Sequence, residues 1–359
     1  MSTTASAEHH SLFVDTTGNV WGCGFNENGQ LGHGDRLHRN KLTKNPNLRG
    51  IALLAATGYH SLFLDRQHRV WSCGNNYYGQ LGLQDEVTRL LPTRIENIPP
   101  MKSVACGAFF SLFLDFEGNV WASGSNEFGQ LGLGDIPFTS KLIKIENLPE
   151  IKNISAAQFH SVLLDIDGRV WVCGSNEFGQ LPLPQSTGCN QFLKISNLPE
   201  IKMVATGETH SLFLDFKGRV WTCGNNELGQ LGSEINSEES AFELKKIKDL
   251  PEIQTVACGS GNSIFLDNSG GVWVSGALGS EHSTFKPHKL TGISKIESVT
   301  VCAHALLLDT DGKVWGLGDN GYHQLGVSEN NLSLPEKLDS LPEIQTKSLR
   351  FKKTKNARF

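Results

Sequence analysis

Tryptophan recurs along this chain at an almost constant spacing. The seven tryptophans are Trp21, Trp71, Trp121, Trp171, Trp221, Trp273 and Trp315, and the gaps between them are 50, 50, 50, 50, 52 and 42 residues. A repeat of this length is typical of structural units that are stacked or arranged around an axis. Residues that recur in every copy are therefore expected to build the scaffold, and the activity is expected where the copies differ.

Each tryptophan lies within a longer shared pattern. An aspartate stands six residues before it, at Asp15, Asp65, Asp115, Asp165, Asp215, Asp267 and Asp309, and a glycine stands three residues after it. In the segment Asp-x-x-Gly the carboxylate can cap a turn, and the glycine can adopt the positive φ that closes it. We therefore assign these aspartates to turns between two strands rather than to seven separate carboxylate sites.

Each repeat contains four segments with strand character, and we find no helical periodicity. The short apolar segment 61–65 and the Val-Trp segment after the turn form the central pair. Weaker strands are predicted at 93–98 and 101–106, with equivalents at 144–148, 151–156, 194–198 and 201–206. Four short strands with their connections need about 40–50 residues, which agrees with the spacing of the tryptophans.

These repeats predict an all-β seven-bladed β-propeller of four-stranded blades. In a ring each sheet packs against two neighbours, whereas a linear solenoid needs atypical end repeats. No inner strand is evident before His10, and a spare strand follows at 341–349, so we expect the C-terminal strand to pair into the first blade and close the ring. We expect an N-terminal extension at 1–8, the propeller at 9–350 and a basic tail at 351–359, with each tryptophan packed between adjacent blades.

The shared elements resemble those of the regulator of chromosome condensation repeat family. They are His-Ser-Leu-Phe-Leu-Asp, Gly-x-Val-Trp-x-x-Gly and Asn-x-x-Gly-Gln-Leu-Gly, and the resemblance covers residues 9 to 350. Members of the family include a nucleotide-exchange factor for the Ran GTPase, regulators of other small GTPases, domains of large ubiquitin ligases and effectors of intracellular microbes. The resemblance implies a protein partner, with a small GTPase of the Ran or Rab class as the leading candidate. It implies no covalent chemistry and no cofactor.

The chain departs from the Ran exchange factor in three respects. That factor inserts a long β-wedge beside its nucleotide, and the even tryptophan gaps leave no room for one in those blades. It also has a basic arm for chromatin, whereas residues 1–8 contain no Lys or Arg. Finally, the sixth repeat has Ala-Leu-Gly-Ser-Glu-His at 277–282 in place of the Gly-Gln-Leu element. GTPase binding is therefore a more direct implication than exchange, and a non-catalytic scaffold for chromatin, a membrane or a ubiquitin ligase is the alternative.

The composition favours an intracellular protein without a membrane span. Charged residues make up 19% of the chain and the formal net charge is −5, whereas broad nucleic-acid binding requires a basic surface. We find no signal peptide or long apolar run. The eight cysteines include no Cys-x-x-Cys pair, so we expect reduced thiols and no metal site. We also expect a monomer, located in the cytoplasm or nucleus. The basic cluster at 350–358 can be a nuclear signal, a membrane tether or a solvated end.

Two motifs suggest chemistry at first sight. Residues 316–321 match Gly-x-Gly-x-x-Gly, but a dinucleotide site needs a helix directly behind the glycines, and an ordinary repeat end follows instead. A histidine opens the second strand in five repeats, at His10, His60, His160, His210 and His304, and a serine follows it in four of them. Adjacent residues of a strand point to opposite faces. We therefore predict buried hydrogen-bonding histidines rather than Ser-His catalysis, and no enzyme active site.

The residue before this histidine position varies among the repeats. In order it is His9, Tyr59, Phe109, Phe159, Thr209, Gly261 and Ala303, and Phe110 replaces the histidine in the third repeat. Clustered surface aromatics are typical interface anchors. We therefore nominate as partner-binding residues His9, Tyr59, Phe109, Phe110 and Phe159, together with Arg36 and Arg39 from the basic loop of the first repeat. The alternatives are that the aromatics plug the channel mouth or pack on the next blade, and that the loop charges reflect drift in solvated loops.

Overall fold

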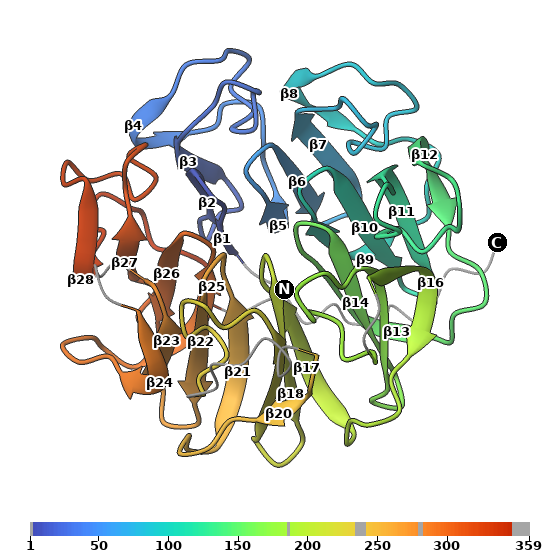
Figure 1. Ribbon diagram of the computed structural model, residues 1–359. Helices are drawn as coiled ribbons and strands as arrows, with labels where there is room; N and C mark the ends of the chain where they lie inside the picture. The colour runs from blue at the N-terminus through green and yellow to red at the C-terminus, as the bar shows by residue number, and fades with distance from the viewer. Residues whose placement is uncertain (1–2, 185–186, 234–241, 279–282, 347–359) are drawn as a thin grey trace, which may run out of the picture.

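The chain forms a ring of seven antiparallel sheets. The computed structural model describes residues 3–184, 187–233, 242–278 and 283–346. Each of the seven sheets has four strands, and the sheets stand around a central axis (Figure 1). The prediction of an all-β, seven-bladed propeller is confirmed. We number the blades 1 to 7 in chain order.

The two strands nearest the axis are the inner and second strands of each blade. The inner strands are β1 (Thr4–Ser6), β5 (Ile51–Ala56), β9 (Met101–Cys106), β13 (Ile151–Ala156), β17 (Ile201–Thr206), β21 (Ile253–Cys258) and β25 (Ile296–Val301). The second strands are β2 (His10–Val14), β6 (His60–Asp65), β10 (Phe110–Asp115), β14 (His160–Asp165), β18 (His210–Asp215), β22 (Asn262–Asp267) and β26 (His304–Asp309).

The third and outer strands complete each blade toward the rim. The third strands are β3 (Val20–Gly24), β7 (Val70–Gly74), β11 (Val120–Ser125), β15 (Val170–Ser175), β19 (Val220–Gly224), β23 (Val272–Gly276) and β27 (Val314–Asp319). The outer strands are β4 (Arg39–Lys44), β8 (Arg89–Arg94), β12 (Phe138–Lys144), β16 (Gly188–Lys194), β20 (Lys245–Lys246), β24 (Thr284–Lys289) and β28 (Asn331–Lys337).

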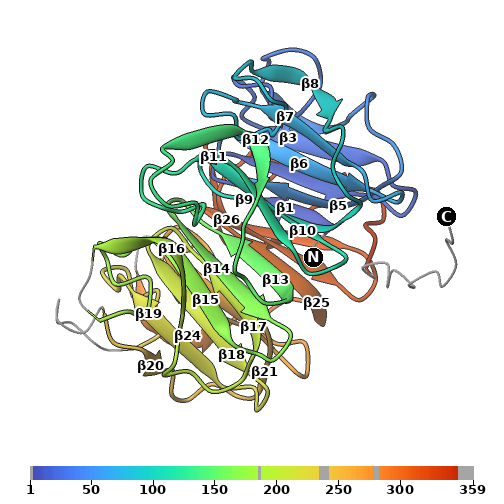
Figure 2. The same ribbon diagram turned by 90° about the vertical axis from the view of Figure 1, so that its right-hand side faces the viewer.

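The strand order gives the ring two different faces. Because neighbouring strands are antiparallel, the turn from inner to second strand and the long loop from third to outer strand lie at the same end of a blade. We call this end the loop face. The Asp-x-x-Gly turns lie at the opposite end, which we call the hairpin face. Seen from the side, blades 4 and 5 lie next to each other (Figure 2), so their corresponding loops share a face.

The repeated aspartate and tryptophan hold each hairpin to the preceding blade. Oδ1 of Asp115 accepts hydrogen bonds from the backbone N–H groups of Glu117 and Asn119, both at 2.9 Å. Its Oδ2 accepts one from the indole N–H of Trp121 at 3.0 Å, and this Asp–Trp bond measures 3.0–3.4 Å across the seven blades. Trp121 packs against the core of blade 2. The predicted turn caps and the tryptophan positions are confirmed, and the Asp–Trp bond is an additional role of the carboxylate.

The predicted position of the outer strand is wrong by about one strand length. Sequence analysis places it at 93–98, 144–148 and 194–198, whereas β8, β12 and β16 end at residues 94, 144 and 194. The segment that follows each of these strands turns toward the next blade, with Asn97 at a φ of 59° and Asn147 at 62°. The true outer strand is a partly exposed edge without regular alternation of buried and exposed residues. Its sequence therefore predicts a strand less clearly than the more apolar segment that follows it in the chain.

The predicted closure of the ring is also corrected. The inner strand of blade 1 is β1, which pairs with β2 through Thr4↔Phe13 and Ser6↔Ser11. Residues 4–6 therefore belong to the blade rather than to an N-terminal extension. Sequence analysis missed β1 because Thr4-Ala5-Ser6 is small and polar where most other inner strands carry Ile, Leu or Val.

The C-terminal segment completes the innermost strand position of blade 1, beside β1. Ile344 forms a bridge with Asp15, and the backbone N–H of Gln345 donates to the carbonyl of Val14 at 3.3 Å. The hydroxyl of Thr3 donates to the carbonyl of Gln345 at 2.7 Å. The inner position of blade 1 is therefore composite, with residues from both ends of the described chain. Residues 347–349 of the predicted closing strand lie outside the described residues.

Candidate partner-binding face

The repeated histidines form buried links between blades. Nε2 of His60 lies 2.9 Å from the hydroxyl oxygen of Ser111 in the next blade, and that hydroxyl donates to the carbonyl of Gln80 at 2.7 Å. Because the serine has one proton and gives it to Gln80, His60 must donate from Nε2. Burial lowers the pKa of His60 to about 3, so it is neutral at physiological pH. The adjacent Ser61 is not its partner, and no Ser-His nucleophile is formed at this position.

Equivalent links recur around the ring. The Nε2 atoms of His10, His160, His210 and His304 lie 2.6–3.3 Å from the serine hydroxyl oxygen of the following blade, with His304 bonding to Ser11 across the closure between blades 7 and 1. The prediction of buried hydrogen-bonding histidines is confirmed. The closure is thus held by the same bond as four of the other six interfaces, and Phe110 and Asn262 replace the histidine at the remaining two.

The variable residues of the inner turns lie on the loop face, where all but the buried Gly261 are half-buried. The rings of Tyr59 and Phe109 stack with centroids 4.8 Å apart and an interplanar angle of 16°. A glycine supports each turn from below: Gly74 has a φ of 109°, and a Cβ there would lie 2.5 Å from the carbonyl oxygen of Tyr59. This close approach of two backbones explains why glycine recurs three residues after each tryptophan, and it fixes the backbone that carries the aromatic side chain.

A second set of apolar residues, missed in the sequence, meets the inner turns. It occupies the position two residues before the repeated glutamine of the long loops and comprises Tyr78, Phe128, Phe178, Leu228 and Tyr322. Ring centroids lie 5.5 Å apart for Tyr78 and Phe109, 4.7 Å for Phe128 and Phe159, and 4.7 Å for Tyr322 and His9. The aromatics therefore pack on the next blade, as one of the alternatives expects, and they also keep exposed area. Comparing the variable residues inside Asn-x-x-Gly would have revealed this set.

Phe110 does not belong to this surface. Its side chain is fully buried, and it occupies the position that histidine has in the neighbouring blades. Consecutive strand residues point to opposite sides, so the exposure of Phe109 requires Phe110 to face inward. The nomination of Phe110 as a partner-binding residue is corrected on this ground.

The two nominated arginines differ in their surroundings. Arg39 forms an ion pair with Asp35 at 2.7 Å and also donates to the carbonyl of Leu37 at 2.6 Å. Its blade 2 equivalent, Arg89, pairs with Asp85 in the same way at 2.5 Å, so this pair is a structural device of the long loop. Arg36 is exposed and donates to the carbonyl of Glu27. Arg36 is the more available of the two for a partner.

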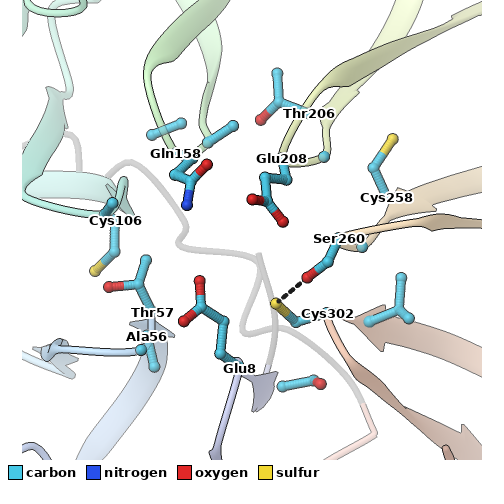
Figure 3. A pocket seen from close by; sticks show the side chains of 18 residues that line it. Glu8, Ala56, Thr57, Cys106, Gln158, Thr206, Glu208, Cys258, Ser260 and Cys302 are labelled. Atoms are coloured by element: carbon cyan, nitrogen blue, oxygen red, sulfur yellow. Dashed lines mark hydrogen bonds between the residues drawn. The ribbon is translucent and has the colours of Figure 1, made fainter. Parts of the chain in front are cut away.

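The channel mouth on the loop face carries two carboxylates. A cavity of about 130 Å³ on the axis is lined by residues from all seven blades. Glu8, Gln158 and Glu208 point toward one another across it (Figure 3). Burial and the nearby carboxylate of Glu8 raise the pKa of Glu208, while a hydrogen bond from Gln158 lowers it. The centre of the loop face is therefore polar and acidic, and the aromatic residues lie around it.

Within the described residues, no group of three or more His, Cys, Asp or Glu side chains is arranged to hold a metal ion. All eight cysteines are free thiols. Residues 316–321, the Gly-x-Gly-x-x-Gly match, lie in the end of β27 and the turn after it, with no helix behind them. A search of the described part of the chain finds no helix with the length and apolar character of a membrane span.

Comparisons with known proteins identify the repeat. The sequence profile of the regulator of chromosome condensation (RCC1) repeat matches residues 17–64, 67–114, 117–164, 167–214 and 217–266. No curated protein sequence matches the chain significantly.

Several solved structures share the fold. Human WBSCR16 superposes with a TM-score of 0.80 at 21% identity, covering 89% of this chain and 94% of the other. Yeast RCC1 (Prp20) bound to Kap60 gives a TM-score of 0.80 at 21% identity, covering 94% and 88% of the two chains. Prp20p of Saccharomyces cerevisiae, described with its binding to Gsp1p and histones, gives 0.78 at 21% identity over 94% and 90%. Since the matched repeats span more than half of its length, the chain belongs to the regulator of chromosome condensation (RCC1) repeat family.

Proposed function

We propose that this chain binds a small GTPase of the Ran or Rab class through its loop face and regulates the nucleotide state of that GTPase. The observation that carries the proposal is the aromatic surface of blades 2 to 4, where Phe109 contacts both Tyr59 and Tyr78, and Phe128 contacts Phe159. Partly exposed aromatic clusters of this kind are typical anchors of protein interfaces.

The relatives support a protein partner of this class. The family includes an exchange factor for the Ran GTPase, and the similar structure of Prp20p was described with binding to Gsp1p and histones. At 21% identity the structural likeness carries the fold, and the GTPase comes to this chain as a proposal. Such a regulator would act in the cytoplasm or nucleus.

Regulation would need no covalent chemistry by the propeller. A surface that binds the nucleotide-free GTPase more tightly than the nucleotide-bound form weakens nucleotide binding by the same factor, because the two equilibria are linked. Nucleotide then leaves faster if the transition state for release is also stabilised. In this mechanism the aromatic residues supply affinity, and the acidic channel mouth selects a partner with basic groups opposite it.

One observation favours a second function, a scaffold that captures its partner without changing nucleotide affinity. The tryptophan gaps of 50, 50, 50, 50 and 52 residues show that blades 1 to 5 are close to equal in length. These blades therefore carry no long inserted element able to reach under a bound nucleotide.

Release of a fluorescent GDP analogue from a panel of purified small GTPases tests the proposal. We expect the chain to capture at least one member in its nucleotide-free form and to accelerate release from that member. Capture without acceleration would support the scaffold. No capture of any member, under conditions where the propeller is folded, would contradict the proposal.

A further inference from the structure

A groove lies on the loop face between blades 3 and 4. It has a volume of about 610 Å³ and is lined by residues 126–129 and 134–137 of blade 3 and 187–190 of blade 4. It is near the starts of the outer strands β12 and β16, away from the axis (Figure 1). The groove is distinct from the channel mouth, and only Phe128 joins it to the aromatic surface described above.

In blades 1 and 2 the aspartate of the corresponding loop is fully engaged within its own blade. Oδ1 of Asp85 accepts hydrogen bonds from the side chain of Asn76 at 3.1 Å and from the backbone N–H of Val87 at 3.0 Å. Oδ2 pairs with Arg89 at 2.5 Å. Asp35 has the same three kinds of partner in blade 1. There the carboxylate closes the loop and its charge is neutralised.

Blade 3 keeps the aspartate but loses these partners. Pro137 stands where Val87 donates its N–H in blade 2, and Thr139 stands where blade 2 has Arg89. Asp135 instead accepts one hydrogen bond from the side chain of Asn190 in blade 4, at 2.7 Å. Among the described residues none forms an ion pair with Asp135 or with Glu127. The groove therefore contains a carboxylate that is no longer needed to close its own loop.

Apolar side chains surround this carboxylate. Phe128 is 45% exposed and Ile136 is 42% exposed, and Pro137 lies beside them. The residues at the position of Ile136 are Arg36 in blade 1 and Glu86 in blade 2. An exposed apolar group at this place therefore distinguishes blade 3 from blades 1 and 2, and it coincides with an aspartate that has no ion pair among the described residues.

Hydrogen bonds to backbone carbonyls fix the walls of the groove. The side-chain amide of Asn126 donates to the carbonyls of Gly134 and Ile136, at 3.0 and 2.6 Å. The N–H of Gly134 donates across the blade boundary to the carbonyl of Asn190 at 2.9 Å. A preformed groove of this kind spends little ordering entropy on binding.

We propose that this groove docks an extended segment of a partner protein in which an apolar residue stands next to a lysine or arginine. The apolar side chain would pack between Phe128 and Ile136, and the basic group would pair with Asp135, with Glu127 at the rim. Charge complementarity argues for this occupant, because an exposed carboxylate without an ion-pair partner in the described part of the chain, beside apolar area, selects a cation with an apolar neighbour. The proposal does not depend on the partner being a GTPase.

A positional-scanning array of octapeptides tests the proposal with the purified full chain. We expect enrichment of peptides that carry Leu, Ile, Met or Phe next to Lys or Arg. The best peptide, measured by fluorescence anisotropy, should bind Asp135→Asn and Phe128→Ser at least about tenfold more weakly, a loss of about 1.4 kcal/mol. Binding should also weaken as salt is raised, because one attraction is between charges.

Matched controls come from the next blade. Glu177 and Phe178 occupy in blade 4 the positions of Glu127 and Phe128 but do not line the groove. Glu177→Gln and Phe178→Ser should bind the peptide as the wild type does. An array without a basic–apolar preference, or a preference that survives both Asp135→Asn and Phe128→Ser, would overturn the proposal. Neither result depends on GTPase capture, so the two proposals can fail separately.

Discussion

At the scale of single residues, the propeller is held together by side chains that each form hydrogen bonds with two neighbouring groups. Asp115 caps its own turn and also holds the indole of Trp121, which packs on blade 2. Ser111 accepts from His60 and donates to Gln80, both in the preceding blade. A buried polar group left without its partner costs about 1–3 kcal/mol, so these links are sensitive to substitution.

The histidine links predict acid sensitivity. The pKa of His60 falls from the ordinary 6.5 to about 3 through burial, so below pH 6.5 the unfolded chain binds a proton that the folded chain does not. The stabilising contribution is complete above pH 6.5 and is lost as pH falls toward 3. Each such histidine contributes a slope of about 1.4 kcal/mol per pH unit in this window.

His60→Asn should flatten this slope, because blade 6 carries Asn262 at the same position. Urea unfolding at pH 7.5, 6 and 5 measures the effect, and the variant should lose about 1.4 kcal/mol less per pH unit than the wild type. The exposed His288 supplies the control, since His288→Asn should keep the wild-type slope. Identical slopes for wild type and His60→Asn would show that the link does not set the acid sensitivity.

At the scale of elements, the sequence predicts the central strands well because their apolar residues are covered on both faces. The inner strands β9, β13 and β17 also match the predicted bounds. The outer strands were misplaced because they are exposed edges, where solvent tolerates mixed residues and no alternation is required. The strand β1 was missed because its composition is polar and its partner strand supplies the apolar contacts.

The candidate site was predictable only in part, for a related reason. Repeat alignment located Tyr59, Phe109 and Phe159, because the variable position beside a shared histidine stands out. It also included Phe110, although Phe110 stands at the histidine position that the alternation along a strand predicts to be buried. The groove aspartate Asp135 could not be distinguished from Asp35 and Asp85 without the hydrogen bonds that separate them.

The composite inner position of blade 1 gives a stability prediction. Ile344 is fully buried and occupies the place that Ile51 occupies in blade 2. Ile344→Ala and Ile51→Ala should each destabilise the fold by about 2–5 kcal/mol, because both leave a cavity in an inter-blade core. Denaturant midpoints measure the losses. Leu334→Ala, at a site that is 73% exposed, should have almost no effect. A neutral Ile344→Ala would show that the C-terminal segment does not support the first blade.

At the scale of the whole molecule, carboxylates recur on the loop face. Glu27, Glu127, Glu177 and Glu227 recur in the long loops of the loop face, with Glu8 and Glu208 at the channel mouth. At the other end, the outer-strand residue paired with each tryptophan is a cation, namely Lys44, Arg94, Lys144, Lys194, Lys246, Lys289 and Lys337. The seven repeated aspartates lie on this same hairpin face, so it is the carboxylates around the channel mouth and in the long loops that would attract a basic partner to the loop face.

The most direct test of the account compares the two faces in one binding measurement. The dissociation constant for the GTPase captured from the panel is measured with the double variant Tyr59→Ala/Phe109→Ala and with Phe216→Ala. Phe216 is 62% exposed in the Asp-x-x-Gly turn of blade 5, on the hairpin face. Because interface anchors typically contribute more than about 1 kcal/mol each, the loop-face double variant should bind at least about tenfold more weakly, and Phe216→Ala should match the wild type. Unchanged affinity in the folded double variant, or a loss confined to Phe216→Ala, would contradict the assignment of the loop face as the binding surface.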